Sequence, residues 1–279
     1  MFLRRNTKRR IGAIIVALLI VVIIGSAVCS LYPLIEEKWA TLESFLDELE
    51  KLDIEPPSIT LNENFTADDI PEYNGEIVIE VNGNVPFFSD DEKAVDAPYE
   101  YYSPLDSLGR CGVTHALLNK SLMPTEPRES ISHVYPSGWE QGKYDFVDGK
   151  YLYNRCHLIG FQLAGENDTK ENLITATRTF NLSMLPYENS VASFVRKGGE
   201  VLYRVTPIYN GNDLVATGVL MESLPISGSG DKDEVTFCIF VYNVEPGVEI
   251  DYSTGENWLA EETSLAIVFV DKRILAFAA

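Results

Sequence analysis

The pattern of apolar and polar positions divides the chain into an apolar N-terminal run, an acidic helical stretch and a long region of short strands. The apolar run covers residues 11–28, interrupted by Gly and Ser alone, and is just long enough to cross a bilayer as a helix. Residues 1–10 carry five cations and no anions, which keeps such an N-terminus cytoplasmic. We therefore expect a basic tip and a transmembrane anchor at residues 11–31, with a signal peptide as the open alternative.

The stretch that follows, residues 32–70, is acidic and prone to form a helix. Its apolar positions have heptad spacing: Ile35, Trp39, Leu42, Leu46 and Leu49. Barely two heptads are too few for a secure coiled coil, so the pattern predicts a helical stalk that ends at Pro56-Pro57. It leaves weak self-association through the stalk open.

Short alternating runs dominate the chain from residue 75 onwards. Three of them contain Asn-Gly or Asp-Gly turns and predict hairpins, or for the first a paired strand: "GEIVIEVNGNVPFF", "YDFVDGKYLYNRC" and "GEVLYRVTPIYNGNDLVATGVLMES". A fourth, "EVTFCIFVYNV", predicts a buried strand. Between the second and third lies a predicted helix, with Pro186 in its first turn and Gly198-Gly199 at its end. Strands, then a helix, then strands indicate an α+β fold with antiparallel pairing.

The charge of the chain argues against a simple nucleic-acid-binding protein. The formal net charge is −20, and after the first ten residues 17 Lys and Arg face 42 Asp and Glu. Such a surface repels polyanions at long range. Binding of nucleic acid would need a local group of cations.

Cysteine and histidine residues raise three possibilities for the chemistry. His157 directly follows Cys156, which allows a thiol nucleophile, a zinc site with Cys111 and His115, or a lone general base. Neighbours on a strand point to opposite faces, and structural zinc sites normally contain a C-x2-4-C pair, so the first two are disfavoured. A location outside the cell would permit a disulfide between Cys111 and Cys156.

Two oxygen-bearing residues further along the chain are consistent with a general base at His157. Asn181 supplies a neutral oxygen ligand, and Glu188 follows seven residues later. A single helix would put both on one face, although Pro186 between them disfavours a straight helix. Mg²⁺ prefers oxygen ligands and needs few protein groups. A histidine base beside such an ion is the equipment for hydrolysis of a phosphodiester.

The stretch "YLYNRCHLIGFQLAGENDTKENLITATRTFN" resembles the DNA/RNA non-specific endonucleases of the ββα-metal (His-Me finger) type, in particular the secreted and membrane-anchored nucleases of Gram-positive bacteria. Their signature Asp-Arg-Gly-His reads Asn154-Arg155-Cys156-His157 here. The resemblance extends over residues 75–253, through motifs such as "DSLGRCGVTHALL" and "PSGWE". It implies a ββα-metal nuclease core with a central antiparallel sheet.

The resemblance also assigns roles to individual residues. It makes His157 the general base, Arg155 the signature arginine and Asn172 a second active-site asparagine. Asn181 would bind Mg²⁺, for which Mn²⁺ can substitute, and Glu188 would hold the ion through a water molecule. Two cations near the site, Arg178 and Arg196, are candidates for contact with the substrate phosphate. No comparable amide and carboxylate residues accompany His115 or His133, and we interpret both histidines as structural.

Together these observations predict five parts: 1–10, 11–31, 32–70, a nuclease domain at 71–253 and a C-terminal tail at 254–279. The predicted activity is Mg²⁺-dependent hydrolysis of DNA, with RNA left open, by a domain outside the cell. The protein would be anchored in the membrane, or secreted if the N-terminal segment is cleaved. A surface DNA-binding or uptake receptor with a weak site and a stalked adhesion module are the alternatives.

Overall fold

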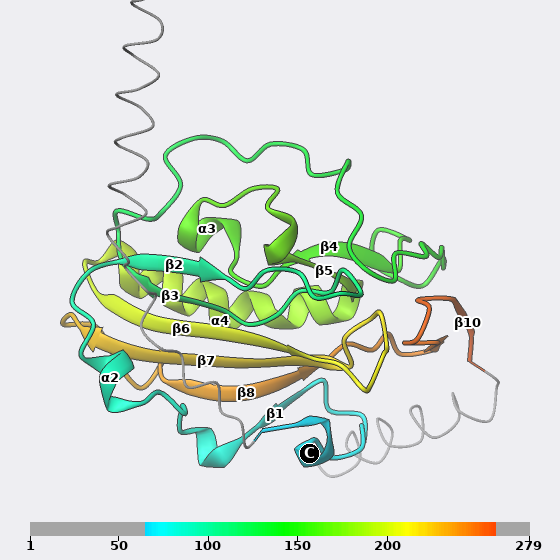
Figure 1. Ribbon diagram of the computed structural model, residues 1–279, viewed down its shortest axis with the longest axis horizontal. Helices are drawn as coiled ribbons and strands as arrows, with labels where there is room; N and C mark the ends of the chain where they lie inside the picture. Colours follow the sequence, from blue (N-terminus) through cyan, green and yellow to red (C-terminus); the bar gives the residue numbers. More distant parts are fainter. Residues whose placement is uncertain (1–64, 261–279) are drawn as a thin grey trace, which may run out of the picture. The chain divides into compact units, whose positions relative to one another are not determined.

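The structure is a computed structural model that describes residues 65–260. Its main element is a six-stranded antiparallel sheet with the strand order β1-β8-β7-β6-β3-β2 (Figure 1). The long central hairpin, β6 and β7, carries the alternating runs around the "NGND" turn. The strands are β1 (Val78–Glu80), β2 (Tyr99–Tyr102), β3 (Thr114–Leu118), β6 (Glu200–Ile208), β7 (Gly218–Ser227) and β8 (Phe237–Tyr242).

A smaller ββα unit lies against one face of this sheet. Strand β4 (Tyr153–His157) pairs antiparallel with β5 (Leu173–Thr177), and α4 (Arg178–Arg196) follows β5 without a loop. Helix α4 contacts β4 and β5 as well as β6 and β8, so it joins the ββα unit to the sheet (Figure 1). The remaining elements are short: η1 (Ala67–Asp69), η2 (Asn82–Asn84), α2 (Asp90–Lys93), α3 (Phe161–Ala164), η3 (Lys170–Asn172), β9 (Val248–Ile250) and β10 (Asn257–Leu259).

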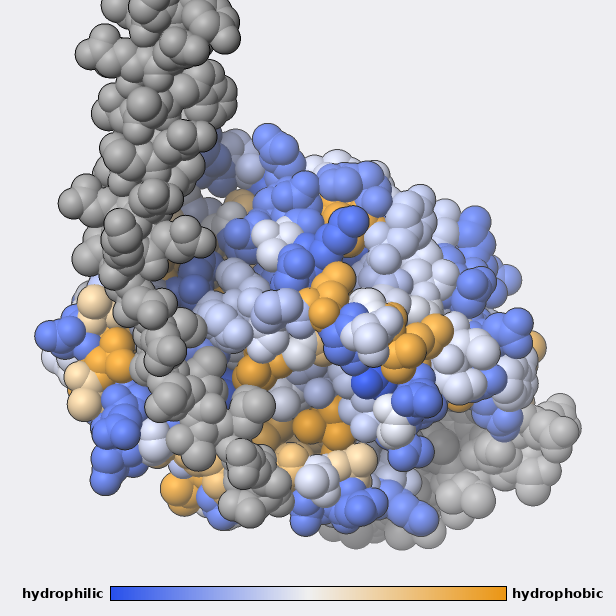
Figure 2. All heavy atoms as spheres, viewed as in Figure 1, coloured by the Kyte–Doolittle hydropathy of each residue, from blue (hydrophilic) through white to orange (hydrophobic). Residues whose placement is uncertain are grey.

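One hydrophobic core fills the space between the sheet, α4 and the β4–β5 pair. The buried face of α4 contributes Phe180, Met184 and Val191 to it. Fully burying a side chain of this size stabilises the fold by roughly 1.5–3 kcal/mol. On the face of the molecule seen in Figure 2, hydrophobic residues lie in separate spots among hydrophilic ones.

The opposite face of the sheet carries a buried row of polar side chains. His115, Arg204, Glu222 and Cys238 lie directly across from one another on β3, β6, β7 and β8. The Arg204 guanidinium is 1% exposed and pairs with Glu222 (2.6 Å) and with Glu92 of α2 (2.7 Å). Because a buried charge must be paired, this network fixes α2 over the sheet.

The junction between β5 and α4 is tied to the end of β8. The buried Asn243 side chain accepts a hydrogen bond from the backbone N–H of Thr177 (2.9 Å) and donates to the carbonyls of Thr175 (3.1 Å) and Ala216 (2.9 Å). Two residues later, Glu245 accepts from the backbone N–H (2.9 Å) and the hydroxyl (2.7 Å) of Thr179. A carboxylate in this position also suits the positive end of the helix dipole.

The predicted start of the helix at Pro186 is wrong. Helix α4 begins at Arg178, where the Thr177 hydroxyl caps it by accepting from the Phe180 N–H (3.1 Å), and Pro186 lies in its interior. An internal proline costs about 3 kcal/mol. The buried side chains on either side of Pro186 outweigh that cost, while Pro186 itself is exposed.

The predicted strand pairs have different outcomes. The hairpin around "NGND" and the buried strand in "EVTFCIFVYNV" are confirmed as β6–β7 and β8. In "YDFVDGKYLYNRC" the turn reduces to a single bridge between Lys143 and Tyr151, and β4 pairs with β5 instead. In "GEIVIEVNGNVPFF" the paired-strand alternative is confirmed and the hairpin is not, because β1 pairs with β8 and the Asn-Gly turn becomes η2.

Residues after the expected end of the nuclease domain at position 253 still form part of the described fold. Beyond the expected boundary at residue 253, β10 pairs with β9, and the Asn257 side chain accepts from the Tyr144 hydroxyl (2.7 Å). The expected basic tip, anchor and most of the stalk lie outside the described residues, as does most of the tail. Within residues 65–260, no helix is long and apolar enough to cross a membrane.

Replacing Asn243 tests whether this side chain holds the junction between β5 and α4. We expect Asn243→Ala to lower the free energy of unfolding by about 2–4 kcal/mol, because three buried backbone groups lose their partner. Urea denaturation of the whole protein measures this loss. Asn212→Ala, in an exposed turn, is the control and should change it by less than about 0.5 kcal/mol. Equal stability of the two variants would contradict the role given to Asn243.

Candidate active site

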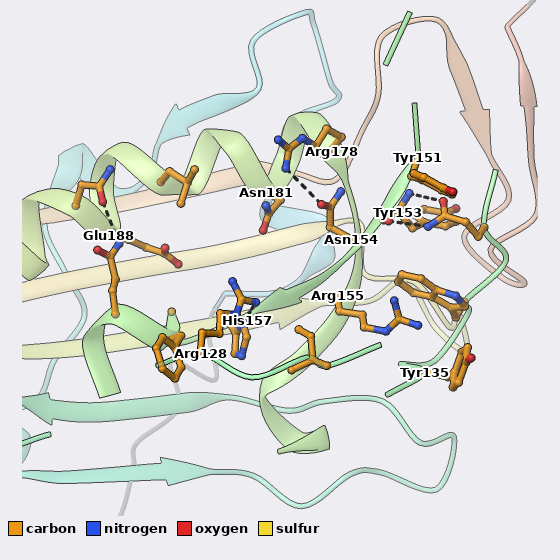
Figure 3. Close-up of a pocket in the computed structure, with 18 residues that line it drawn as sticks. Arg128, Tyr135, Tyr151, Tyr153, Asn154, Arg155, His157, Arg178, Asn181 and Glu188 are labelled. Carbon is orange, nitrogen blue, oxygen red and sulfur yellow. Dashed lines mark hydrogen bonds between the residues drawn. The ribbon is translucent and has the colours of Figure 1, made fainter. Parts of the chain in front are cut away.

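A cleft of about 1000 Å³ opens between β4, α3, the first half of α4 and the segment before β4 (Figure 3). It contains His157, Asn181 and Glu188, which the sequence analysis grouped together. Three arginines and one glutamate are the charged residues along its wall, so the cleft is locally basic in an acidic chain. The charged lining residues are Arg128, Arg155, Arg178 and Glu188.

His157 ends β4 and is 7% exposed. Its Nε2 lies 2.8 Å from the carbonyl oxygen of Asn167. A carbonyl can only accept, so Nε2 carries the proton of the neutral ring and Nδ1 keeps the lone pair. Burial lowers the pKa of His157 below its ordinary value of 6.5, and the Arg128 charge acts in the same direction. The imidazole is therefore neutral at pH 7, as a general base must be.

Arg128 is the cleft residue that the sequence analysis missed. Its Nη2 lies 3.4 Å from Nδ1 of His157, a long contact that a ligand can replace (Figure 3). The segment that carries Arg128 is held nearby by the Glu129 N–H, which donates to the Asn167 side chain (3.1 Å). Asn167 thus positions both His157, through its backbone, and the arginine segment, through its side chain.

Asn181 and Glu188 face the cleft from the same side of α4 (Figure 3). The Glu188 carboxylate is 6% exposed and forms no ion pair within residues 65–260. Burial raises its pKa to about 7, although Gln162 and Arg128 act to lower it. It also packs against Gly160, where a Cβ atom would lie 2.8 Å from a carboxylate oxygen. A buried carboxylate without a cationic partner favours binding of a cation.

Arg155 lines the cleft but is engaged in other contacts. Its Nε and Nη2 donate to the carbonyls of Val134 and Ser132, the latter at 2.8 Å. Its guanidinium carbon lies 4.2 Å from the ring centre of Trp139 and 5.1 Å from that of Tyr135. A contact with substrate phosphate would compete with these bonds, so the geometry favours a role in holding the 132–139 segment on β4.

The two other predicted phosphate cations differ in position. Arg178 lines the cleft, but Asp148 accepts from its Nε (2.9 Å) and Nη2 (2.7 Å), which offsets part of its charge. Arg196 does not line the cleft. It is an exposed residue in the last turn of α4, 3.5 Å from the amide oxygen of Gln162, so its prediction as a phosphate ligand is not supported.

Asn172 is completely buried and does not line the cleft. Its Oδ1 accepts from the N–H of Ile159 (2.8 Å), and its Nδ2 donates to the carbonyl of the same residue (3.0 Å). Both ends of the amide are used on the backbone two residues after His157. The structure therefore corrects the expected direct role: Asn172 holds the turn that follows β4.

The predicted disulfide between Cys111 and Cys156 is wrong, since both thiols are free. The Cys111 thiol donates to the carbonyls of Lys170 and Leu173 (both 3.2 Å), and burial raises its pKa to about 12. The Cys156 sulfur lies 3.6 Å from the Met184 sulfur in the core. Each cysteine behaves as a small buried hydrophobic residue.

The zinc alternative also fails, because Cys111 and His115 do not share a helix. His115 lies in β3, where its Nδ1 is 3.1 Å from the Tyr99 hydroxyl, and burial lowers its pKa to about 4. Exposed His133 contacts Asp168 (3.0 Å) outside the cleft. Residues 65–260 contain no group of three or more His, Cys, Asp or Glu side chains placed to bind a metal ion.

Comparisons with known proteins show what this part of the chain is similar to. Residues 91–224 match the family of DNA/RNA non-specific endonucleases, which covers the cleft residues named above. This segment of the chain is therefore similar to the DNA/RNA non-specific endonucleases.

Two solved structures of one protein share the fold. A crystal structure of NucA from Streptococcus agalactiae with a magnesium ion bound is 24% identical, with a TM-score of 0.59 over 70% of this chain and 94% of that one. The same protein with no metal bound gives a TM-score of 0.58, again at 24% identity, over 70% and 92%. The Sda1 nuclease with a bound zinc ion gives 0.48 at 25% identity, over 58% and 81%.

The state of the cysteines can be tested directly. We expect Cys111, Cys156 and Cys238 all to be alkylated in denaturant without reductant, as measured by mass spectrometry of the digested protein. In the native protein the reaction should be far slower, because the thiols are buried and their pKa values are raised. If the peptides of Cys111 and Cys156 are alkylated only after reduction, the two residues form a disulfide.

Proposed function

We propose that this endonuclease domain hydrolyses phosphodiester bonds of DNA or RNA with one Mg²⁺ and without sequence preference. The observation that supports this most is the pairing, in one cleft, of a neutral histidine with a buried, unpaired carboxylate and an amide on the facing helix. The proposed site acts outside the cell, with residues 11–31 as the membrane anchor, or on a secreted protein if that segment is removed.

His157 is the proposed general base. Its Nδ1 takes a proton from the attacking water while Nε2 keeps its hydrogen bond to the Asn167 carbonyl, which fixes the ring and stabilises the imidazolium. Arg128 moves from Nδ1 to a non-bridging oxygen of the phosphate. There its positive charge stabilises the negative charge that develops on the phosphate in the transition state. The bond between phosphorus and O3′ then breaks, which leaves a 5′-phosphate on the product.

The residues of the cleft fit a divalent cation. Asn181 would bind it directly, and Glu188 would hold it through a water molecule. Both are oxygen donors on one helix, and Mg²⁺ uses few protein ligands of this kind. When bound, the ion supplies positive charge at the phosphate and at the leaving oxygen. The structure of NucA with magnesium supports the choice of ion.

Arg155 and Asn172 are proposed as positioning residues. Arg155 attaches the 132–139 segment to β4, and Asn172 fixes the backbone just after His157. A plasmid-nicking assay with Mg²⁺, Mn²⁺ or EDTA tests the whole proposal. Metal-dependent nicking is expected. DNA binding without cleavage would indicate a receptor. The absence of both binding and cleavage would indicate an adhesion module.

The first prediction concerns the base. We expect His157→Ala to lower nicking by roughly 10²–10⁴-fold, the usual contribution of a positioned general base. His133→Ala is the matched control, because His133 is exposed outside the cleft, and it should nick at the parental rate. Activity of His157→Ala within threefold of the parent would show that the base is another residue.

The second prediction concerns the ion. Asn181→Ala should raise the Mg²⁺ concentration for half-maximal activity at least tenfold, whereas Asn212→Ala should not change it. Glu188→Gln should also raise it, but without loss of stability in EDTA. Burial raises the pKa of this carboxyl to about 7, so its ionisation lowers the stability of the fold as the pH rises from about 4.5 to about 7. At pH 8 the full cost is present, and the neutral amide removes it.

Melting temperatures in EDTA at pH 8 and Mg²⁺ titrations of activity measure the two effects separately. An unchanged Mg²⁺ requirement in both variants would place the ion elsewhere. A large fall in the melting temperature of Glu188→Gln would make the residue structural.

A further inference from the structure

The end of the cleft away from Glu188 is lined by aromatic side chains that the proposed chemistry does not use. Tyr135 and Tyr151 lie there, with His157 and Asn181 between them and Glu188 (Figure 3). Trp139 also lines the cleft and packs against Tyr135, and we call these three residues the aromatic arm. Tyr135 is 69% exposed and Tyr151 is 50% exposed. Large aromatic rings that remain in contact with water inside a cleft contribute little to the core and indicate a binding surface.

Each exposed ring of the aromatic arm has a cation against it. The Arg155 guanidinium lies 5.1 Å from the centre of the Tyr135 ring and 4.2 Å from that of Trp139. On the other side of the cleft, the Lys143 ammonium lies 4.6 Å from the centre of the Tyr151 ring. The cation covers one face of each ring, and the exposure of the tyrosines leaves the remaining face accessible.

The aromatic arm is held in place before any ligand arrives. The hydrogen bonds of Arg155 fix the backbone on either side of His133, and Tyr135 stands edge-on to Trp139 at 6.5 Å. Tyr151 lies in the bridge with Lys143, next to Tyr153, whose backbone bonds to the Gln141 side chain (2.7 and 2.8 Å). Rings fixed in this way lose little conformational entropy when they bind a flat ligand.

We propose that the aromatic arm stacks one or two unpaired bases of the strand whose phosphate lies at His157, so that single-stranded or locally melted nucleic acid is cut in preference to an intact duplex. This inference rests on the proposed nuclease function and narrows its substrate. Bases in an intact duplex are stacked on each other and cannot offer a face to a tyrosine. An aromatic platform next to cations that can reach the backbone is how proteins bind single strands.

The chemistry of the arm is consistent with cleavage at any sequence. Every base has a π-face, so stacking supplies affinity without reading the base edges. Arg155 and Lys143 add positive charge beside the rings, where the neighbouring phosphates would pass. The overall charge of −20 makes such local attraction necessary.

Binding in EDTA tests the stacking without cleavage. The probes are an eight-nucleotide single strand and the same strand with abasic sites, each with a fluorescent label, and the affinity ratio of the two is measured by anisotropy. The unaltered protein should bind the complete strand about 5- to 150-fold more tightly, from about 1–3 kcal/mol of stacking per base. In Tyr135→Ala and Tyr151→Ala this ratio should move towards one.

Tyr73→Ala is the matched control, because Tyr73 is a partly exposed tyrosine outside the cleft, and its ratio should equal that of the unaltered protein. Circular dichroism checks that each variant is folded. Equal affinity of the unaltered protein for the two strands would overturn the proposal, and so would an unchanged ratio in both arm variants.

A cleavage assay separates failure of this inference from failure of the nuclease assignment. With Mg²⁺, kcat/KM should be higher for the single strand than for a hairpin-closed duplex of the same sequence, and the Tyr135→Ala and Tyr151→Ala double variant should reduce that preference. Equal cleavage of both substrates would overturn the stacking and leave the nuclease in place. If neither substrate is cut, the proposed function fails, while the binding ratio still decides whether the aromatic arm stacks bases.

Discussion

The hydrogen bonds from the buried Asn243 side chain to Thr175, Thr177 and Ala216 determine where the two halves of the cleft meet. Thr177 ends β5 and caps α4, so one residue sets the direction of both elements. Strand β4 pairs with β5 and carries His157, whereas α4 carries Asn181 and Glu188. The angle between His157, the proposed base, and the predicted metal ligands therefore depends on a buried amide that does not line the cleft.

The cleft contains several buried polar groups of a kind that normally lowers the stability of a protein. Glu188 is buried without an ion pair, His157 is buried in its neutral form, and Arg128 makes only a long contact with it. By contrast, the buried Arg204 on the other face of the sheet has both of its carboxylate partners. The same fold thus satisfies its structural charge and leaves its candidate active-site groups available for ligands.

Two kinds of support position the two ends of the cleft. At the proposed metal end, the side chains project from a long helix and a strand end, which are rigid because their other faces lie in the core. At the aromatic end, side-chain bonds from Arg155 and Gln141 to the backbone replace secondary structure. This division suits a hydrolase that must place one phosphate accurately but accept different bases.

The sequence by itself was enough to find the α+β class and the β6–β7 hairpin, because both depend on local periods along the chain. Its resemblance to a nuclease family grouped His157, Asn181 and Glu188, and the structure places these three residues along one cleft. Only the tertiary structure decided the start of α4, because the burial of Phe180 and Met184 outweighs the internal proline. It also decided the roles of the remaining polar residues. The bond of Arg128 to His157 spans 29 positions, and those of Arg155 and Asn172 go to backbone groups. Backbone groups are the same at every position, so no sequence pattern could have shown which ones these side chains would meet.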